Sequence, residues 1–148
     1  MQCAFDEAAS GVRNNQGGPF GAVVVLEGKI VGRGHNRVTS DNDPTAHAEI
    51  VAIREACKAL GAFHVDGAVL YVTCEPCPMC LAAVYWAHIK TICYCYDRND
   101  AAKIGFDDNF IYDEISLPIK QRKIEMTKMR VSNTLFQDWV EKPDKINY

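Results

Sequence analysis

The chain has 148 residues, of which 48% are hydrophobic and 24% are charged, and its net charge is −3. This length allows one domain with a hydrophobic core and is too short for two. The weak acidic charge argues against general nucleic-acid affinity, and no apolar run approaches the roughly 20 residues of a membrane-spanning helix.

The first third of the chain predicts a helix followed by a β-hairpin. "CAFDEAASGV" places a set of apolar or small side chains on one helical face: Phe5, Ala8, Ala9 and Val12. "GGPFG" then breaks the helical pattern, and the continuous apolar run "FGAVVVL" predicts a strand that is covered on both faces. "EGK" turns this strand back into an antiparallel partner, "KIVGRGHN".

The middle of the chain predicts alternating helices and strands. "DPTAHAEIVAIREACKALG" predicts a helix with Asp43 as its N-cap, Pro44 at its first position and Gly61 at its end. "GAVLYVTC" and "KTICYCY" predict strands. Between them, "PMCLAAVYWAHI" predicts a helix that is apolar on nearly every side and therefore buried between layers. Strands joined by crossover helices pair in parallel.

The C-terminal third is less regular. Residues 97–118 predict loop and short helix, "IEMTKMRV" a fifth strand, and "SNTLFQDWVEK" a last helix that ends at Pro143. We interpret the short basic cluster between Lys120 and Arg130 as a solvent-facing strand and loop and not as a nucleic-acid surface. Together the elements predict a single α/β domain over residues 1–148, a three-layer α/β/α sandwich around a mixed, mainly five-stranded sheet.

The cysteines and the N-terminus indicate a cellular compartment. The first residues, "MQCAFDEAASGVRN", contain acids and lack the basic start of a signal peptide. Seven cysteines is an odd number, and without a signal peptide the default is free thiols in a reducing compartment. We therefore expect a cytoplasmic protein without a disulfide framework.

Two short motifs, "HAE" at 47–49 and "PCPMC" at 76–80, carry the candidate chemistry. Each lies at the start of a predicted helix. The residues between them are enough for one helix, one strand and their turns, so both helix starts should meet at the same edge of the sheet. Open α/β sheets place their functional sites at this edge.

The three evenly spaced thiols of "TCEPCPMC" are expected to be unequal. Pro78 suits the first helical position. Cys77 would then be the N-cap and Cys80 would lie in the first turn, where the helix dipole favours the thiolate that binds metal. Cys74 ends a strand and should pack away from the other two. With His47, the two thiols supply three zinc ligands and leave the fourth position to water, which is the pattern of a catalytic site.

Glu49 is the candidate proton carrier for that water. Residues two apart do not face each other on a regular helix, so the pair requires His47 to lie near the helix cap. Two other interpretations remain open at this point. A structural zinc site would recruit Cys74 as a fourth ligand and would make the chain an interaction domain, and Cys77 and Cys80 alone would form a redox pair.

The combination of "HAE" with "PCPMC" resembles the zinc-dependent deaminases of the cytidine deaminase superfamily, whose signature has this pattern. "GGPFGAVVV", "NDPTAHAE" and "AAKIGFDDNFIYDEI" are similar to the bacterial guanine deaminase branch, from Gly17 to about Ile115. The resemblance implies hydrolysis of guanine to xanthine and ammonia in purine salvage or catabolism. It also implies one Zn²⁺ per subunit and a homodimer with exchanged C-terminal segments, 131–148. Cytosine, guanosine or adenosine in tRNA are the alternative substrates.

The resemblance also implies roles for individual residues. The zinc ligands would be His47, Cys77 and Cys80. Glu49 would be the proton shuttle, Asn36 a hydrogen-bond donor and acceptor for the purine edge, and Asp108 the acid that recognises guanine and assists proton transfer. Further substrate contacts would come from Ala48, Trp86, Phe106 and Tyr148. Tyr148 would act as a lid from the partner subunit. On residue type alone, Asn36 suits a strand end, Asp108 a helix cap and Trp86 core packing.

Overall fold

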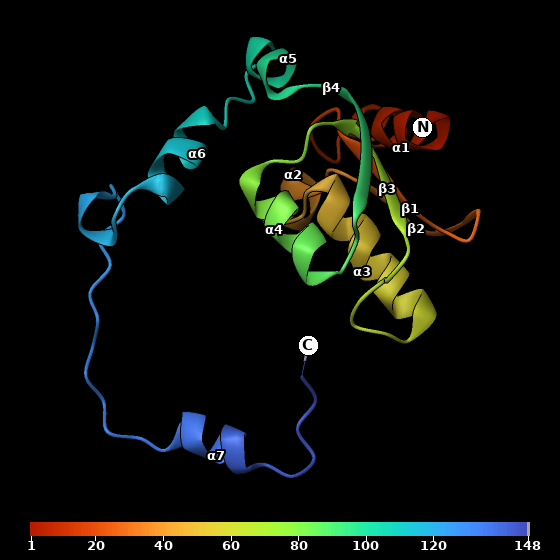
Figure 1. The fold of residues 1–148 in the computed structure, drawn as a ribbon. Helices are drawn as coiled ribbons and strands as arrows, with labels where there is room; N and C mark the ends of the chain where they lie inside the picture. Colours follow the sequence, from red (N-terminus) through yellow and green to blue (C-terminus); the bar gives the residue numbers. More distant parts are fainter. Residues whose placement is uncertain (148) are drawn as a thin grey trace.

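The computed structural model describes residues 1–147, and Figure 1 shows the order of its elements. The strands are β1 (Gly21–Leu26), β2 (Lys29–His35), β3 (Val69–Cys74) and β4 (Thr91–Tyr96). The helices are α1 (Gln2–Arg13), α2 (Val38–Asp41), α3 (Ala48–Leu60), α4 (Pro78–Trp86), α5 (Arg98–Lys103), α6 (Asn109–Ser116), the 3-10 helix η1 (Ile119–Gln121) and α7 (Leu135–Glu141). Within this part of the chain, none of the helices has the length and apolar character needed to span a bilayer.

One mixed sheet positions the other elements. In the described residues its strand order is β2-β1-β3-β4; β1 is antiparallel to both β2 and β3, and β3 is parallel to β4. The predicted hairpin and the predicted parallel pair are therefore confirmed. The strands β2, β3 and β4 run in the same direction. Helices α3 and α4 therefore both start near the carboxyl ends of these strands, and the loops that follow the two helices lie near the amino ends.

Helices cover both faces of this sheet (Figure 1). On the face of α1, a Cβ atom on Gly21 would come within 2.0 Å of the Ala4 carbonyl oxygen. Gly21 pairs with His35, so Gly34 faces the opposite side, where a Cβ atom would stand 2.3 Å from the Ala48 carbonyl oxygen in α3. The absent side chains let both helix backbones approach the sheet directly. The result is the predicted α/β/α sandwich.

The hydrophobic core lies between the sheet and the layer formed by α3 and α4. Its buried members include Ala22, Val24, Ala52, Ile53, Ala56, Leu70, Val72 and Val84. The prediction that α4 is buried on nearly every side is wrong for this chain, because Tyr85 and Trp86 are 73% and 66% exposed. The outer face of α4 has no covering layer within residues 1–147.

Helix α3 begins later than predicted. The Asp43 carboxylate accepts hydrogen bonds from the backbone N–H and the hydroxyl of Thr45, at 2.8 and 2.7 Å, and so stabilises a turn instead of a helix start. The helix starts at Ala48, with His47 as its N-cap. Its end is as predicted, since Gly61 adopts the left-handed conformation with φ of 63°.

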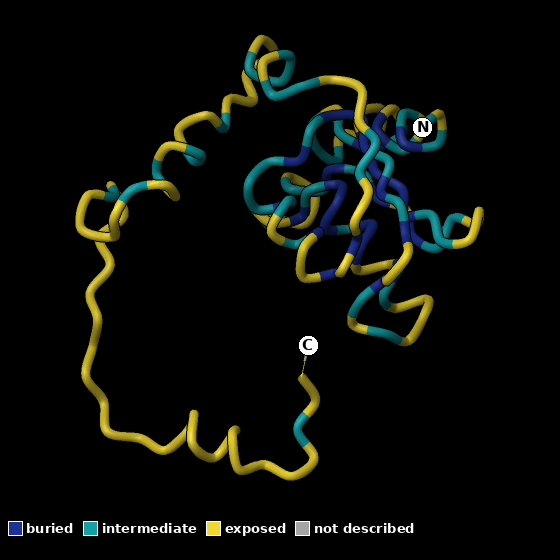
Figure 2. Tube along the Cα trace, viewed as in Figure 1, coloured by how far each residue is buried: buried dark blue, intermediate teal, exposed yellow. Residues whose placement is uncertain are grey.

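The C-terminal third leaves the body of the molecule as an extended arm (Figures 1 and 2). Residues 124–131, predicted as a fifth strand, contain no strand and are all exposed, so the sheet has four strands in the described residues. A strand needs a hydrogen-bonded neighbour, and the chain moves away from the sheet through α5 and α6 before it reaches this segment. Helix α7 forms as predicted, but its larger apolar side chains face solvent: Leu135, Phe136, Trp139 and Val140.

Candidate active site

The three predicted metal ligands meet at the starts of α3 and α4. His47 is the N-cap of α3 and Cys77 is the N-cap of α4, with Cys80 in the first turn. The His47 Nδ1 atom lies 3.6 Å from Cys77 Sγ and 3.5 Å from Cys80 Sγ. Around a tetrahedral zinc ion with Zn–N of about 2.0 Å and Zn–S of about 2.3 Å, adjacent nitrogen and sulfur ligands stand about 3.5 Å apart. These three side chains therefore fit zinc without rearrangement.

Hydrogen bonds among these three ligands shift their pKa values. The hydrogen bond with Cys80 lowers the pKa of Cys77 to about 4, and the hydrogen bond with Cys77 raises the pKa of Cys80. The hydrogen bond with Cys77 also raises the pKa of His47. One thiolate is thus already favoured before metal binds, and binding of a metal ion would release the remaining protons.

Cys74 does not join this cluster. It ends β3, it is buried, and its thiol donates to the Asp97 carbonyl oxygen at 3.4 Å. Burial raises the pKa of Cys74 to about 11, which disfavours the thiolate that a metal requires. Among the described residues, the cysteines at this site are therefore Cys77 and Cys80. This arrangement argues against a closed structural site with three cysteines.

Glu49 lies beside the metal triad in the first turn of α3. His47 has extended backbone angles, φ −68° and ψ 156°, so it stands just outside the helix. The two-residue spacing therefore does not separate the two side chains, and both line the same cavity. Burial raises the pKa of Glu49 to about 7, and a carboxyl group with a pKa near neutrality can both accept and release a proton.

The cavity in front of the triad has a volume of about 500 Å³, which is in the range of small-molecule sites. Its lining includes these predicted residues: Asn36, His47, Glu49, Cys77, Phe106 and Asp108. One wall is aromatic, because the rings of Phe20 and Phe106 pack edge to face with their centroids 4.9 Å apart. An apolar wall with a few polar groups suits a flat heterocyclic ligand.

Asn36 follows β2 directly and is only 6% exposed. Its Oδ1 atom accepts hydrogen bonds from the backbone N–H groups of Gly18, at 3.3 Å, and Val38, at 3.2 Å. The carbonyl side of the amide is therefore occupied in joining two loops. The NH₂ group is the part that Asn36 can offer to a bound molecule, so the structure favours a donor over the expected donor and acceptor.

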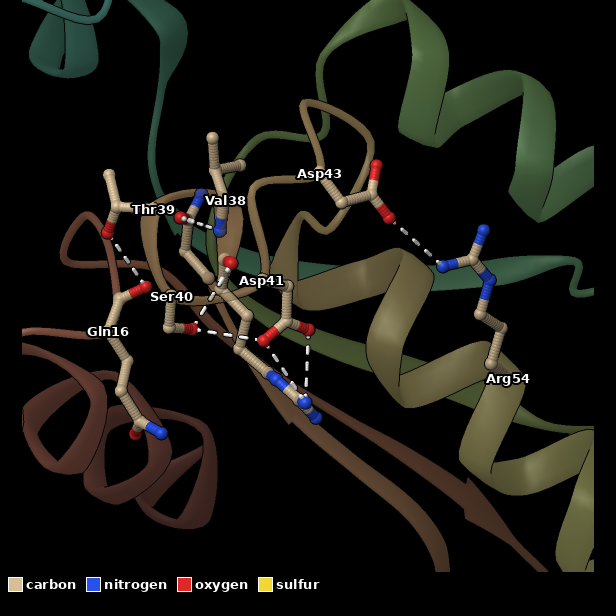
Figure 3. A network of polar contacts seen from close by, with 9 residues as sticks. Gln16, Val38, Thr39, Ser40, Asp41, Asp43 and Arg54 are labelled. Atoms are coloured by element: carbon tan, nitrogen blue, oxygen red, sulfur yellow. Dashed lines mark hydrogen bonds and ion pairs between the residues drawn. The ribbon is translucent and has the colours of Figure 1, made fainter.

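A polar network stabilises the loop between β2 and α3 (Figure 3). The Thr39 hydroxyl donates to the Gln16 carbonyl oxygen at 3.0 Å and so ties this loop to the segment after α1. Asp43 forms an ion pair with Arg54 of α3 at 3.8 Å. Because the loop runs from the end of β2 to the N-cap of α3, the network helps to fix the separation of the amide and the imidazole that line the cavity.

Asp108 lies immediately before α6 and lines the cavity. Within the described chain its side chain makes no capping hydrogen bond, whereas the Asp107 carboxylate accepts from the Asn109 N–H at 3.0 Å. The burial of Asp108 raises its pKa, and the charge of Cys77 adds to this effect. The alternative role of helix cap thus belongs to its neighbour, and the Asp108 carboxylate is available to the cavity.

Apart from Cys80, which is fully buried behind the cavity wall, three predicted site residues are not placed in this cavity. Ala48 packs against Gly34 at the contact between α3 and β2, and Trp86 is exposed at the opposite end of α4 from the metal ligands. Neither is among the described residues that line the cavity. Tyr148 lies outside the described residues.

Tyr112 supports the metal-binding loop, and the sequence did not predict this role. Its hydroxyl donates to the Pro76 carbonyl oxygen at 3.3 Å, one residue before Cys77. The Arg98 guanidinium lies over the Tyr112 ring, 4.6 Å from its centroid, and the Arg98 backbone N–H donates to the Glu75 carboxylate at 3.1 Å. Tyr112 and Pro76 are 36 residues apart, so no local pattern in the sequence could have linked them.

Comparison with known proteins agrees with this geometry. The profile of a family described as the cytidine and deoxycytidylate deaminase zinc-binding region matches residues 1–96. The chain belongs to this family of zinc-binding deaminases. The matched region contains both helix starts that carry the metal triad.

Individual relatives extend the comparison. The chain is 50% identical over 150 residues to the guanine deaminase of Bacillus subtilis, across 100% of this chain and 96% of that protein. An X-ray structure of guanine deaminase from Bacillus subtilis has a TM-score of 0.95 at 49% identity, covering 99% of this chain and 95% of that one. This match confirms the predicted fold. A tRNA-specific adenosine deaminase from Agrobacterium fabrum is 49% identical over 94 residues, which are 64% of this chain and 61% of that protein.

Proposed function

We propose that this protein is a zinc-dependent guanine deaminase, which converts guanine and water to xanthine and ammonia in purine salvage or catabolism. The observation that carries the proposal is the position of Asp108. This carboxylate comes from outside the matched zinc-binding region, and it lines the same cavity as two of the metal ligands, His47 and Cys77. The alignment with guanine deaminase covers this part of the chain as well.

His47, Cys77 and Cys80 would hold the zinc ion. Bound zinc supplies a water-derived nucleophile at neutral pH. Glu49 takes the proton of the attacking water and delivers it to N3 of guanine as the oxygen adds to C2. Glu49 then takes the remaining proton from the new hydroxyl on C2 and donates it to the amino group on C2, the C2–N bond breaks, and ammonia leaves. The oxygen that remains on C2 completes xanthine.

Asn36 and Asp108 offer complementary groups to the purine. Guanine carries N–H donors at N1 and at the amino group on C2, and the Asp108 carboxylate can accept from this edge and assist the proton transfers. The Asn36 NH₂ group can donate to a ring nitrogen or carbonyl acceptor of the base. The apolar wall formed by Phe20 and Phe106 provides a surface for the flat ring.

A substrate panel tests the proposed function. The protein is incubated separately with guanine, cytosine, adenine, guanosine and a tRNA anticodon stem-loop, and ammonia release or base conversion is measured. We expect turnover of guanine to exceed that of every other substrate. Turnover of the tRNA stem-loop or of another base without turnover of guanine would overturn the proposal. The basic cluster of the chain lies in the exposed arm and not around the cavity, which disfavours a tRNA substrate.

We infer that the protein is a homodimer in which residues 131–148 of each chain pack on the partner's body. The arm exposes apolar side chains on α7, and the body exposes aromatic residues on α4 and β4: Tyr85, Trp86, Tyr94 and Tyr96. Burying such apolar surface removes it from water, which favours association. Exchange of identical segments between subunits is a common route to a dimer. In this dimer Trp86 would belong to the subunit contact.

We place the protein in the cytoplasm. In residues 1–147 all seven cysteines are free. Two of them are the proposed zinc ligands, which must stay reduced to bind metal. A reducing compartment satisfies this requirement.

A further inference from the structure

A second cluster of metal-binding side chains lies far from the active site. The His64 Nδ1 atom lies 2.8 Å from Asp66 Oδ2, and the His88 Nδ1 atom lies 3.3 Å from Asp66 Oδ1. One donor atom from each of the three residues lies within 4.8 Å of the other two. The two imidazole rings are nearly parallel, with centroids 4.8 Å apart and an interplanar angle of 16°. Each imidazole thus contacts a different oxygen of the same carboxylate, and the stacked rings must turn by a side-chain rotation to direct both nitrogens at one ion.

A buried framework holds these three residues in place. The Val65 backbone N–H donates to the Ala87 carbonyl oxygen at 2.9 Å, and both residues are buried. This bond joins the loop after α3 to the loop after α4, so His64 and Asp66 are fixed beside His88. His88 itself has a positive φ of 59° and donates its backbone N–H to the Tyr85 carbonyl oxygen at 3.0 Å. The side chains are partly exposed, but these backbone hydrogen bonds fix the segments that carry them.

The donor set suits a divalent transition metal. Two neutral imidazoles and one carboxylate are the protein ligands of one kind of zinc site. With metal–ligand distances of 2.0 to 2.2 Å, neighbouring donors of a tetrahedral ion stand about 3.4 Å apart. The distance of 3.3 Å between His88 Nδ1 and Asp66 Oδ1 matches this value, whereas His64 Nδ1, at 2.8 Å from Asp66 Oδ2, must move outward by a fraction of an ångström when an ion enters. The three side chains are 36%, 59% and 44% exposed, so an ion can enter and keep water at its remaining positions. Lys90 lines the neighbouring groove, but within the described residues it forms no ion pair with Asp66.

We propose that His64, Asp66 and His88 form a second metal site, on the surface, for a divalent ion of the zinc class. The site lies at the ends of α3 and α4, whereas the active site lies at their starts. Helix α3 has 13 residues, and so it separates the two sites by about 20 Å at 1.5 Å per residue. A bound ion cross-links the two loops and stabilises the folded protein by an amount that grows logarithmically with the free ion concentration above the dissociation constant. This proposal does not depend on guanine being the substrate.

Zinc titration of the zinc-loaded holoenzyme tests the second site. Using zinc itself avoids metal exchange at the active site. In a buffer that does not bind metal, calorimetry should show one further equivalent of Zn²⁺ per chain, and the thermal midpoint should rise with added Zn²⁺. The double variant His64→Ala/His88→Asn should lose the further equivalent and the rise in midpoint. Asn suits position 88 because it tolerates a positive φ.

Two further variants make the result specific. His35→Gln removes an imidazole outside the cluster and should keep the further equivalent. Asp66→Asn preserves the size of the side chain and should weaken zinc binding by more than the about 10- to 100-fold expected for loss of an outer-sphere partner. All of these variants should still release ammonia from guanine. The absence of a further equivalent in the unmodified holoenzyme, or its persistence in the double variant, would overturn the second site.

Discussion

At the scale of single residues, the N-cap residues of α3 and α4 in the active site do not cap their helices with their side chains. Ser, Thr, Asp and Asn are preferred at this position because their side chains accept a hydrogen bond from the helix N–H groups, and losing such a cap costs about 1 kcal/mol. Within residues 1–147, His47 and Cys77 make no side-chain capping bond. Their side chains instead point to each other and to Cys80. The positive ends of the two helix dipoles therefore lie beside a thiolate at the metal site.

At this scale, a substitution of Glu49 should remove catalysis without removing metal binding. Glu49→Gln removes the group that carries the proton but leaves all three metal ligands in place. We expect the variant to keep one zinc per chain and to lose ammonia release from guanine by about 10²- to 10⁴-fold, the usual contribution of a positioned acid or base. Steady-state kinetics and metal analysis of the same preparation measure both quantities.

Cys77→Ser is the matched control for Glu49→Gln, because it removes a ligand and should lose zinc and activity together. Glu49→Gln with full activity would rule out the proton-shuttle role. Glu49→Gln without zinc would show that the residue serves metal binding instead.

At the scale of the elements, the sequence predicted the features that depend on residues close together in the chain. The Pro78 position predicted the start of α4 and with it the inequality of the three thiols. Parallel crossover connections predicted that His47, Glu49 and Cys77 would meet. The Asp43 start of α3 was wrong because Thr45 offers that carboxylate a competing turn. The contact of Phe20 with Phe106, like that of Tyr112 with Pro76, joins distant segments and depends on tertiary packing.

The close approach of α3 to β2 should be sensitive to a single methyl group. In Gly34→Ala the new Cβ atom would stand 2.3 Å from the Ala48 carbonyl oxygen, so the start of α3 must move. Overpacking of this kind costs about 1–3 kcal/mol. We expect a loss of this size in the free energy of unfolding, measured by urea denaturation of the zinc-loaded protein. Zinc affinity should fall as well, because the metal ligand His47 immediately precedes Ala48 and is the N-cap of α3.

Arg33→Ala is the control for Gly34→Ala. Arg33 is adjacent on β2, its side chain is half exposed and its ion pair with Glu7 is long, at 3.6 Å. Its removal should change the free energy of unfolding by no more than about 0.5 kcal/mol. Equal effects of the two substitutions would show that the helix–strand contact tolerates the methyl group.

At the scale of the whole molecule, the described chain does not cover its own apolar surface. The body of the molecule is an α/β/α sandwich with its own hydrophobic core. However, the outer face of α4 and the edge strand β4 expose aromatic rings. Figure 2 shows that the arm is exposed along almost its whole length, and α7 within it carries a further set of exposed apolar side chains. Exposed apolar surface on this scale indicates an interaction site. The sequence periodicity predicted α7 correctly, but it could not show that the apolar face of α7 would find no partner within the described residues.

Mixing two inactive chains tests whether the arm of one subunit completes the pocket of the other. One chain carries Glu49→Gln with an intact arm, and the second has an intact body but lacks residues 131–148. If arms are exchanged, a hybrid dimer contains one pocket with Glu49 from the truncated chain and an arm from its partner. Ammonia release from guanine should therefore appear when the chains are co-expressed with different tags and the hybrid is purified through both tags.

The matched control pairs Glu49→Gln with full-length Cys77→Ser. Both substitutions lie in the body, and the structure places Cys77 and Glu49 of one chain in a single cavity. No hybrid pocket then contains both residues, so this mixture should stay inactive. Zinc content shows whether the truncated chain has folded. If the truncated chain binds zinc and its hybrid with Glu49→Gln still releases no ammonia, each arm serves its own chain. Activity in the truncated chain alone would show that the arm is not needed for the pocket.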